Sequence, residues 1–592
     1  MSAGRKPTDL VVSSSVATTL RSASSGPVAA PHPRRADLLA VLVSALGLIL
    51  FVAPGLRVFL RGDDWVRLAL VADPDFGVAD AFTPYANHLT PLGFGVLWLA
   101  RQVGGPAPWG FLVAVAAAFA AVGMAFTWLS VRSLVGARLA ALVPFAVAAW
   151  SPAILAVVMW PAAKVDAPPL FAATAGVLWA YLTGRRRLLL GFMVVGLLFS
   201  QQVLLAVVMI VLVSGFWWRR KPSQIWRADR SLWIALLVVV GIYVVGYVVI
   251  SSRVDALADN ETRGGTVVEG LLVLLAVVIP ELIVHGPWRW RSNVAPAIDY
   301  PFVAHVVIAV IGWFVIIRAR RSGWRAWIPL AGLLFVLVLT LSGARLQAFG
   351  PQVMFNLYYF IVILPLLAAT LAIGYLPNRL PIDEQKRRAP GRRTWIIAGG
   401  ALLVSSVVAA IGYAGAVPQL PSREFLTAAN ASLQQPTLDT SSPRQQFGIF
   451  AYSPPWDTAA HTFALLDMDG QWERSSHDPY MIGPDGNRVP VVLDGIAFDM
   501  PASCVPVQQG YAFDAPMNRD PSWPTYAMTY RTPAATTATI GLGDEQIDVP
   551  LLAGEHTVYF VGDGAADQLT VLAAGTCVSG LRMGQPEPTP GT

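Results

Sequence analysis

Two adjacent carboxylates, Asp63 and Asp64, follow the first long apolar run of the sequence, in the cluster Gly62-Asp63-Asp64-Trp65. A carboxylate at the edge of a membrane is costly to keep, so its default interpretation is functional. Such a group can accept the proton of an attacking hydroxyl, or it can hold a metal ion beside a leaving phosphate. The alternative is that Asp63 caps the helix that follows, and the two roles are compatible.

Polar residues in three other segments predict partners for an anionic group. His88 can bind a phosphate oxygen or transfer a proton, and the neighbouring Asn87 either joins it or caps the next helix. Lys164 is a point charge suited to a phosphate, although it could equally pair with Asp166. Arg345 lies in a segment that we predict to be on the outer side of the membrane, where positive charge is otherwise rare. We therefore expect it to hold a phosphate. Alternatively, the Arg345 side chain only extends from a helix end to the membrane interface and binds no phosphate.

The composition indicates a membrane protein with two differently charged parts. The chain has 592 residues, of which 55% are hydrophobic and 13% charged, and this is too apolar for a soluble protein of that size. Residues 417–592 contain 19 Asp and Glu against 7 Arg and no Lys, a net charge of −12, whereas the rest of the chain carries +18. The split indicates two compartments and argues against nucleic acid as a partner.

Apolar runs of about 20 residues, the length that a helix needs to cross the hydrocarbon layer, recur along residues 37–416. The first extends from about Ala36 to Leu60. Residues 1–36, rich in Ser, Ala, Pro and Arg, are expected to be a disordered cytoplasmic N-terminus and not a cleavable signal peptide. Further runs lie near 107–131, 139–160, 167–183, 231–251, 302–317, 326–343, 357–376 and 394–416.

The stretch 188–218 is too long for one span and has basic residues on both sides. It lies between Arg185-Arg186-Arg187 and Arg219-Arg220-Lys221, and basic loops stay in the cytoplasm. A single crossing would place one of these clusters outside. We therefore expect two short helices joined at Ser200-Gln201-Gln202, which keep both clusters inside.

The stretch 266–285 decides the topology of everything after it. A single crossing here would place the later basic loops outside, so we expect a re-entrant or interfacial helix, broken at Pro280 and Glu281; a tight pair of crossings is the alternative. The result is about 11 spans, with the N-terminus inside and the C-terminal domain outside. The outer segments are then Arg61 to Pro106, Trp160 to Ala167, Ser251 to Tyr300 and Gly343 to Asn356.

Short strands and turns replace the apolar runs in the last part of the chain. Alternating segments separated by Gly and Asp predict a β-sandwich over 425–592, after a linker at 417–424. The only two cysteines, Cys504 and Cys577, both lie in this part. A cysteine pair in an exported domain predicts a disulfide, and two unpaired buried thiols are the alternative.

Several common reaction classes have no motif in this sequence. A Walker lysine loop is missing, so ATP-driven transport is not expected, and neither a zinc-ligand spacing nor a Gly-x-Ser-x-Gly nucleophile motif occurs. No cofactor is therefore predicted with certainty, and a divalent metal ion at the Asp63-Asp64 pair stays open.

The layout resembles the GT-C glycosyltransferases, multi-spanning membrane enzymes that take sugars from polyprenyl-phosphate donors. The resemblance rests on Asp63-Asp64 and His88 in the first outer loop, on the paired short helices at 188–218, and on a final outer domain. That domain is similar in placement to the β-rich, carbohydrate-binding domains of arabinofuranosyltransferases of the bacterial cell envelope.

The resemblance implies that one of Asp63 and Asp64 is the catalytic base, while Arg345, and Lys164 with it, would hold the lipid phosphate. It implies an inverting transfer to a cell-envelope glycan or glycolipid, in the plasma membrane of a bacterium. Two alternatives are a transporter or flippase for a lipid-linked saccharide and a non-catalytic assembly protein whose terminal domain binds glycan.

Overall fold

The structure is a computed structural model of the chain. The residues that it describes are 33–55, 63–85, 88–105, 108–158, 160, 162, 165–251, 266–291, 297–299, 301–320, 324–342, 345–378, 380, 391–416, 423–440, 458–498, 505–507, 511–514, 524–542, 545–562 and 568–589. The chain forms two compact units, a membrane unit (residues 1–56, 77–96 and 113–417) and a second unit (residues 57–76, 97–112 and 418–592). Residues 1–32 of the N-terminus that was predicted to be disordered, and most of the predicted linker, lie outside the described residues. Residues 33–36 begin helix α2, so the prediction of disorder is wrong for these four residues.

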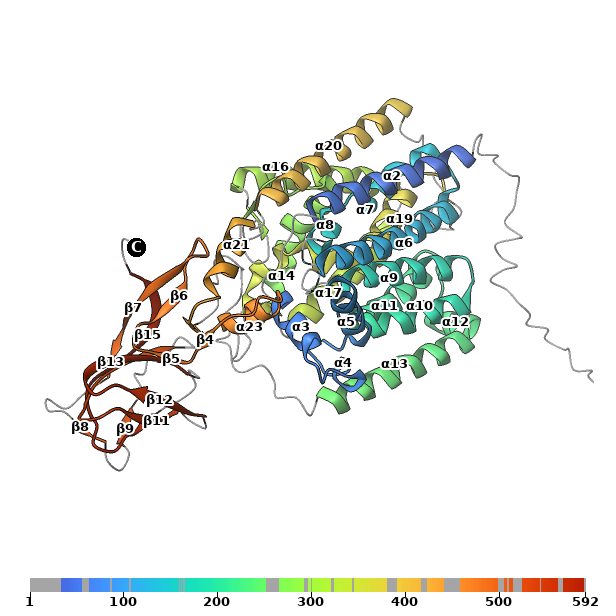
Figure 1. The fold of residues 1–592 in the computed structure, drawn as a ribbon. Helices are drawn as coiled ribbons and strands as arrows, with labels where there is room; N and C mark the ends of the chain where they lie inside the picture. The colour runs from blue at the N-terminus through green and yellow to red at the C-terminus, as the bar shows by residue number, and fades with distance from the viewer. Residues whose placement is uncertain are drawn as a thin grey trace, which may run out of the picture. The chain divides into compact units, whose positions relative to one another are not determined.

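The membrane unit is a bundle of apolar helices (Figure 1). Within the described residues, seven helices are long and apolar enough to cross a membrane, and four shorter apolar helices accompany them. The predicted polytopic helical fold is therefore confirmed. The principal helices are α2 (Pro33–Gly55), α6 (Trp109–Val135), α7 (Leu142–Ala149), α8 (Pro152–Val158), α9 (Ala167–Leu182), α10 (Arg186–Phe199), α11 (Leu205–Phe216), α13 (Arg230–Ser251), α16 (Phe302–Arg320), α17 (Ile328–Ser342), α19 (Leu364–Tyr375) and α20 (Arg392–Ala416).

Helices α10 and α11 form the predicted hairpin. The short 3-10 helix η2 (Gln201–Leu204) connects them, and the Ser200 hydroxyl caps it by accepting the N–H of Gln202. An ion pair joins Arg186, at the start of α10, to Asp229, just before α13. The basic clusters on either side of the hairpin therefore lie at the same end of the bundle, as their charges predict, while η2 lies at the other end of α10.

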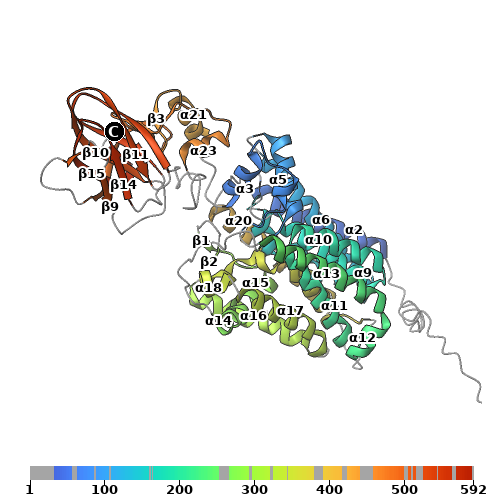
Figure 2. The same cartoon turned by 90° about the horizontal axis from the view of Figure 1, so that it is seen from below.

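A π-helical segment, η3 (Leu274–Val278), separates α14 (Val267–Val273) from α15 (Ile279–Val284). Its cause is Pro280, which has no N–H to donate and whose ring would clash with a carbonyl of the preceding turn. The indole N–H of Trp313 donates to the freed carbonyl of Leu275 at 2.9 Å. Pro280 also packs closely on Gly312, so that α15 lies against α16 (Figure 2).

The chain turns back at His285, directly after α15. Both imidazole nitrogens of His285 are engaged, Nδ1 with the Ser406 hydroxyl at 2.7 Å and Nε2 with the Val147 carbonyl at 3.1 Å. The chain then follows α20 towards its C-terminal end, because Trp288 donates to Ser405 and Trp290 donates to the Ala409 carbonyl. Val267–Val284 is apolar and long enough to cross a membrane. Whether this segment crosses the membrane or re-enters it therefore stays a prediction.

Two antiparallel sheets dominate the second unit. One contains, in order, β5 (Ser475–Ser476), β13 (Gly554–Val561), β10 (Thr525–Thr532), β15 (Cys577–Pro588), β7 (Arg488–Ala497) and β6 (Tyr480–Ile482), with β8 (Val505–Pro506) also paired to β15. The other contains β12 (Glu545–Leu551), β11 (Thr536–Leu542), β14 (Gln568–Leu572) and β9 (Tyr511–Asp514). Buried residues of both sheets form one hydrophobic cluster, which includes Tyr526 and Phe560 from the first sheet and Ile540 from the second. The predicted β-rich C-terminal region is confirmed, with the two-layer core of a sandwich.

Smaller elements precede the sandwich. They are α21 (Arg423–Ser432), β3 (Thr437–Leu438), α23 (Ala459–Ala464) and β4 (Trp472–Glu473), and β3 pairs with β4 in parallel. Cys577 begins β15 and lies opposite Pro506 of β8, two positions after Cys504. Cys504 itself lies outside the described residues, so the bridge between Cys504 and Cys577 stays a prediction.

The contact between Gly312 and Pro280 gives a test of how α15 packs against α16. A Cβ at position 312 would lie 2.6 Å from the Cα of Pro280, whereas a Cβ at Gly246 would meet no atom within 4 Å. We expect Gly312→Ala to lower stability by about 1–3 kcal/mol through overpacking. Gly246→Ala, the matched control, should leave stability unchanged or raise it through helix propensity. Thermal unfolding of both variants in detergent measures the difference, and equal midpoints would contradict the packing.

Asp439 gives a pH-dependent test of the second unit. Burial raises the pKa of its carboxyl from 3.8 to about 6, although the N–H of Ala460 donates to that carboxyl and the charge of Arg474 opposes the shift. The folded chain therefore holds this proton more tightly than the unfolded chain. The stabilising contribution is complete below pH 3.8 and is lost as the pH rises through about 6.

We therefore expect Asp439→Asn, which keeps an acceptor for Ala460, to abolish this pH dependence. At about pH 7.5 the variant should be more stable than the original chain by roughly 1–2 kcal/mol. Thermal unfolding of the full chain between about pH 4 and 8 measures both effects, with the exposed Asp469→Asn as control. A variant that is less stable at high pH and keeps the slope would contradict the assignment.

Candidate functional site

The first loop between spans, residues 61–106, contains three helices, α3 (Asp63–Ala72), α4 (Val78–Ala81) and α5 (Pro91–Gly104). Asp63 is the first residue of α3, and its side chain lies outside the described atoms. The Asp64 side chain is completely buried, and Arg67, three positions later on the same helix, is only 3% exposed. A carboxylate in the first turn of a helix is favoured by the helix dipole. Trp65 and Leu68, also buried, hold α3 in place.

His88 follows a tight reversal of the same loop. The backbone groups of Tyr85 and His88 exchange two hydrogen bonds, with N···O distances of 3.0 and 2.8 Å. Asn87, within this reversal, lies outside the described residues. The reversal presents the His88 imidazole to Arg345, whose Nη2 lies 3.3 Å from Nε2 of His88. A guanidinium only donates hydrogen bonds, so Nε2 must be the acceptor and the imidazole proton must be on Nδ1.

The tip of the α10–α11 hairpin supports the His88 segment from another side. The backbone N–H of Leu89 donates to the side-chain Oε1 of Gln201 at 3.3 Å. Gln201 begins η2, at the end of α10 away from the basic clusters. Sequence reasoning placed the helix break here but did not assign Gln201 to the site; its signal was a pair of glutamines inside a run of apolar residues.

Arg345 is positioned by the residues around it. It begins α18 (Arg345–Phe349), and the next residue, Leu346, is fully buried against Gly270 of α14 and Val338 of α17. Gly350 ends α18 with a φ of 71°, a conformation that favours glycine. The guanidinium is thus held at the end of α17 that lies away from the basic loop at 318–325.

Described residues of a further segment, 160–167, contact α5 and Tyr358. Gly93 at the start of α5 lies close to Val165, because a Cβ at position 93 would be 3.2 Å from a Val165 methyl group. Trp160 makes an edge-on contact with Tyr358, with ring centroids 6.3 Å apart. Lys164 lies outside the described residues, so its side chain is not placed and its role stays a prediction.

The membrane unit thus brings His88, Gln201 and Arg345 together from three separate segments. A guanidinium, an imidazole and an amide suit an anion such as a phosphate, or the hydroxyl groups of a sugar. Among the described residues, no group of three or more His, Cys, Asp and Glu side chains could hold a metal ion.

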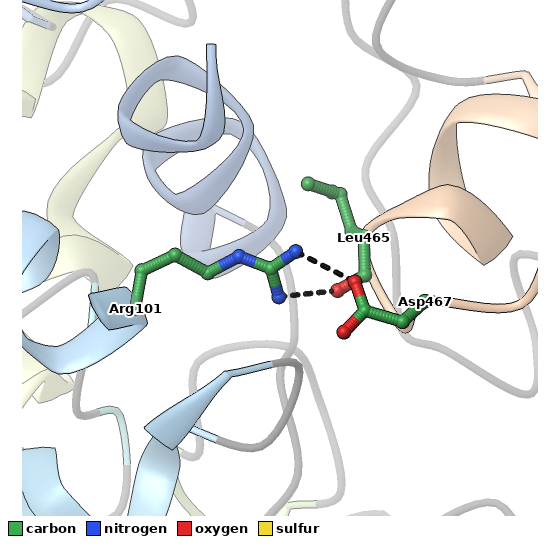
Figure 3. A network of polar contacts seen from close by, with 3 residues as sticks. All are labelled: Arg101, Leu465 and Asp467. Atoms are coloured by element: carbon green, nitrogen blue, oxygen red, sulfur yellow. Dashed lines mark hydrogen bonds and ion pairs between the residues drawn. The ribbon is translucent and has the colours of Figure 1, made fainter. Parts of the chain in front are cut away.

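The second unit contains a polar contact between the first loop and the C-terminal part. Arg101 of α5 donates from Nη1 to the Leu465 carbonyl at 3.0 Å and from Nη2 to the Asp467 carboxylate at 2.9 Å (Figure 3). Leu465 is the C-cap residue directly after α23, so the guanidinium caps the C-terminus of that helix. The Asp64 segment also belongs to this unit.

Comparison with known proteins gives few matches. No protein-family model and no curated protein matches the sequence. Among solved structures, the chain is similar to ArnT from Cupriavidus metallidurans, with 14% identity, a TM-score of 0.43, and coverage of 70% of this chain and 84% of that one. It is also similar to the arabinosyltransferase EmbB from Mycobacterium smegmatis, with 12% identity, a TM-score of 0.31, and coverage of 94% and 64% respectively. TM-scores below 0.5 do not establish a common fold.

The contact of Arg101 predicts a local effect on dynamics. Replacing it by Gln removes the fork that joins Leu465 and Asp467, so we expect amide hydrogen exchange to accelerate about fivefold in residues 97–104 and 459–467. Arg101→Lys keeps the charge without the fork and should give an intermediate rate. Gln102→Ala is the control, since Gln102 is exposed. Exchange that is unchanged in Arg101→Gln would contradict the contact.

Proposed function

We propose that the chain is a membrane glycosyltransferase of the GT-C type, which transfers a sugar from a polyprenyl-phosphate donor to a hydroxyl group of a glycan or glycolipid. The observation that carries the proposal is the contact of Arg345 with His88, supported by Gln201, at the end of the helices away from the basic loops. Three separate segments bring a cation to this end of the helices. A lipid-borne phosphate lies at that depth, with its hydrocarbon chain between the helices.

In this proposal, Arg345 and His88 bind the phosphate of the donor. They stabilise the negative charge that develops on the phosphate as its bond to the anomeric carbon breaks. Asn87 and Lys164 are proposed to contribute further contacts to the donor. Phosphate is already a good leaving group, so the reaction needs neither a nucleotide nor ATP.

The base is proposed to be in the Asp63-Asp64 pair. Asp64 is the candidate whose side chain the structure describes, buried in the first turn of α3, and a carboxylate can act as a general base. The acceptor oxygen loses its proton to the carboxylate as it forms the new bond to the anomeric carbon, on the face opposite the departing phosphate. The configuration is thereby inverted. Assay with a chelator tests whether the pair also holds a divalent metal ion.

The surroundings of the reaction belong to the same proposal. We infer a location in the plasma membrane of a bacterium, with residues 425–592 on the extracytoplasmic side and a role in building the cell envelope. The strongly acidic composition of this part, beside a basic remainder, supports the separation into two compartments.

A second candidate function is transport of a lipid-linked saccharide. Glu281, in α15, is fully buried in the membrane unit, and within the described part of the chain neither carboxylate oxygen has a hydrogen-bond partner. Ionisable groups in such places are typical of transport pathways. Transport would depend on Glu281 and not on Asp64, so Glu281→Gln separates the two candidates.

The kinetic test uses reconstituted full-length protein, a polyprenyl-phosphate sugar and a glycan acceptor. Asp64→Asn should lower kcat about 100-fold or more while the protein still binds the donor. The matched control is Asp75→Asn, since Asp75 is exposed in the same loop.

Arg345→Gln should lower kcat/KM, because it removes both a contact to the donor phosphate, which raises KM, and the stabilisation of the charge that develops on the phosphate, which lowers kcat. Arg345→Lys should recover part of that loss, since it keeps the charge but not the planar fork. No sugar transfer by the original chain, together with transport of a lipid-linked saccharide that Glu281→Gln abolishes and Asp64→Asn keeps, would reject the enzyme in favour of the transporter.

A further inference from the structure

Eight cationic side chains gather at the end of the membrane unit opposite the candidate site. They come from the turn between α9 and α10 and from the connection that leads from α11 through α12 (Pro222–Ala228) to α13 (Figure 1). We call this the basic surface, and its members are Arg185, Arg186, Arg187, Arg219, Arg220, Lys221, Arg227 and Arg230.

The fold holds the two parts of the basic surface side by side. Arg186 from the first part forms an ion pair with Asp229 in the second. The hydroxyl groups of Tyr181 in α9 and Ser214 in α11 are hydrogen-bonded just beneath. The position of α12 is fixed as well, because the indole N–H of Trp233 in α13 donates to the Ile225 carbonyl at 3.0 Å. The surface is therefore built by tertiary contacts and not by one flexible basic stretch.

The segment that forms this surface contains little acidic charge. Asp229 is the only acidic residue between positions 184 and 230, and it is buried in its pair with Arg186. All the cationic residues of the surface except Arg220 are exposed. A loop needs far fewer basic residues than this to stay on the inner side of the membrane. The basic loop at 131–138, for example, has only Arg132 and Arg138, and Arg132 pairs with Asp37.

Aromatic side chains at the same level indicate where the membrane surface lies. Trp226 of α12 is 41% exposed, directly beside Arg227. The Arg185 guanidinium lies over the Trp179 ring, 4.6 Å from its centroid. Tryptophan collects at the level of the lipid head groups, and cations at that level meet the phosphates of those head groups.

We propose that the basic surface is a binding site for the phosphate-bearing head groups of anionic membrane lipids. Lys221 and Arg227 are the central contacts, because both are exposed: Lys221 is the N-cap of α12, and Arg227 follows Trp226 within that helix. The occupant is a lipid and not a soluble phosphate, since the aromatic rings place the cations against the bilayer surface. This proposal is independent of the sugar-transfer function, because it concerns the opposite end of the helices.

The test measures the thermal stability of the full-length protein in mixed micelles of a neutral detergent. Phosphatidylglycerol should raise the unfolding midpoint more than phosphatidylcholine does, and added salt should reduce the difference. The double variant Lys221→Gln, Arg227→Gln should weaken the apparent affinity for phosphatidylglycerol roughly 10- to 30-fold. Its midpoint in phosphatidylcholine should equal that of the original chain, which shows that it folds.

The matched control is the double variant Arg392→Gln, Arg393→Gln, which removes two exposed cations from the start of α20. It should keep the response to phosphatidylglycerol. Inorganic phosphate and pyrophosphate form the last arm, and they should not reproduce the effect. Equal stabilisation by the two lipids, an equal loss in both double variants, or full stabilisation by free phosphate would each overturn the proposal.

Discussion

The contact between Arg345 and His88 joins two loops that are 257 positions apart in the chain, and the candidate site depends on it. Further contacts fix the positions of both partners. The Leu346 side chain anchors Arg345 among α14 and α17, and Gln201 holds the backbone next to His88. Because a guanidinium attracts anions, this arrangement is the position at which we propose that the phosphate of the donor binds.

The low dielectric of the membrane accounts for how the remaining polar groups are arranged. The carbonyl that Pro280 leaves free accepts a hydrogen bond from the indole N–H of Trp313. The two ring nitrogens of His285 form hydrogen bonds with groups of α7 and α20. Basic clusters gather at one end of the helices, where they set the orientation. Glu281 is the exception, because its carboxylate is buried without a hydrogen-bond partner in the described part of the chain. This buried carboxylate is the observation that favours the second candidate function, transport of a lipid-linked saccharide.

The sequence predicts those features that depend on one segment at a time. Apolar length gives the spans, and the basic residues on both sides of 188–218 give the α10–α11 hairpin, which the pairing of Arg186 with Asp229 supports. His88 and Arg345 stand out by residue type. Their pairing, however, depends on tertiary packing, and no local pattern links a loop residue to one 257 positions away. Gln201 was missed for the same reason, since its partner is a backbone N–H in another segment.

The most direct test of the central claim is photo-crosslinking with a polyprenyl phosphate that bears a photoreactive group next to its phosphate, followed by mapping of the labelled peptides. The account predicts that labels fall in residues 85–93, 200–202 and 345–358, and that unlabelled polyprenyl phosphate competes for them while Arg345→Gln reduces them. Labels confined to the basic surface, or labels that unlabelled donor lipid does not displace, would contradict it.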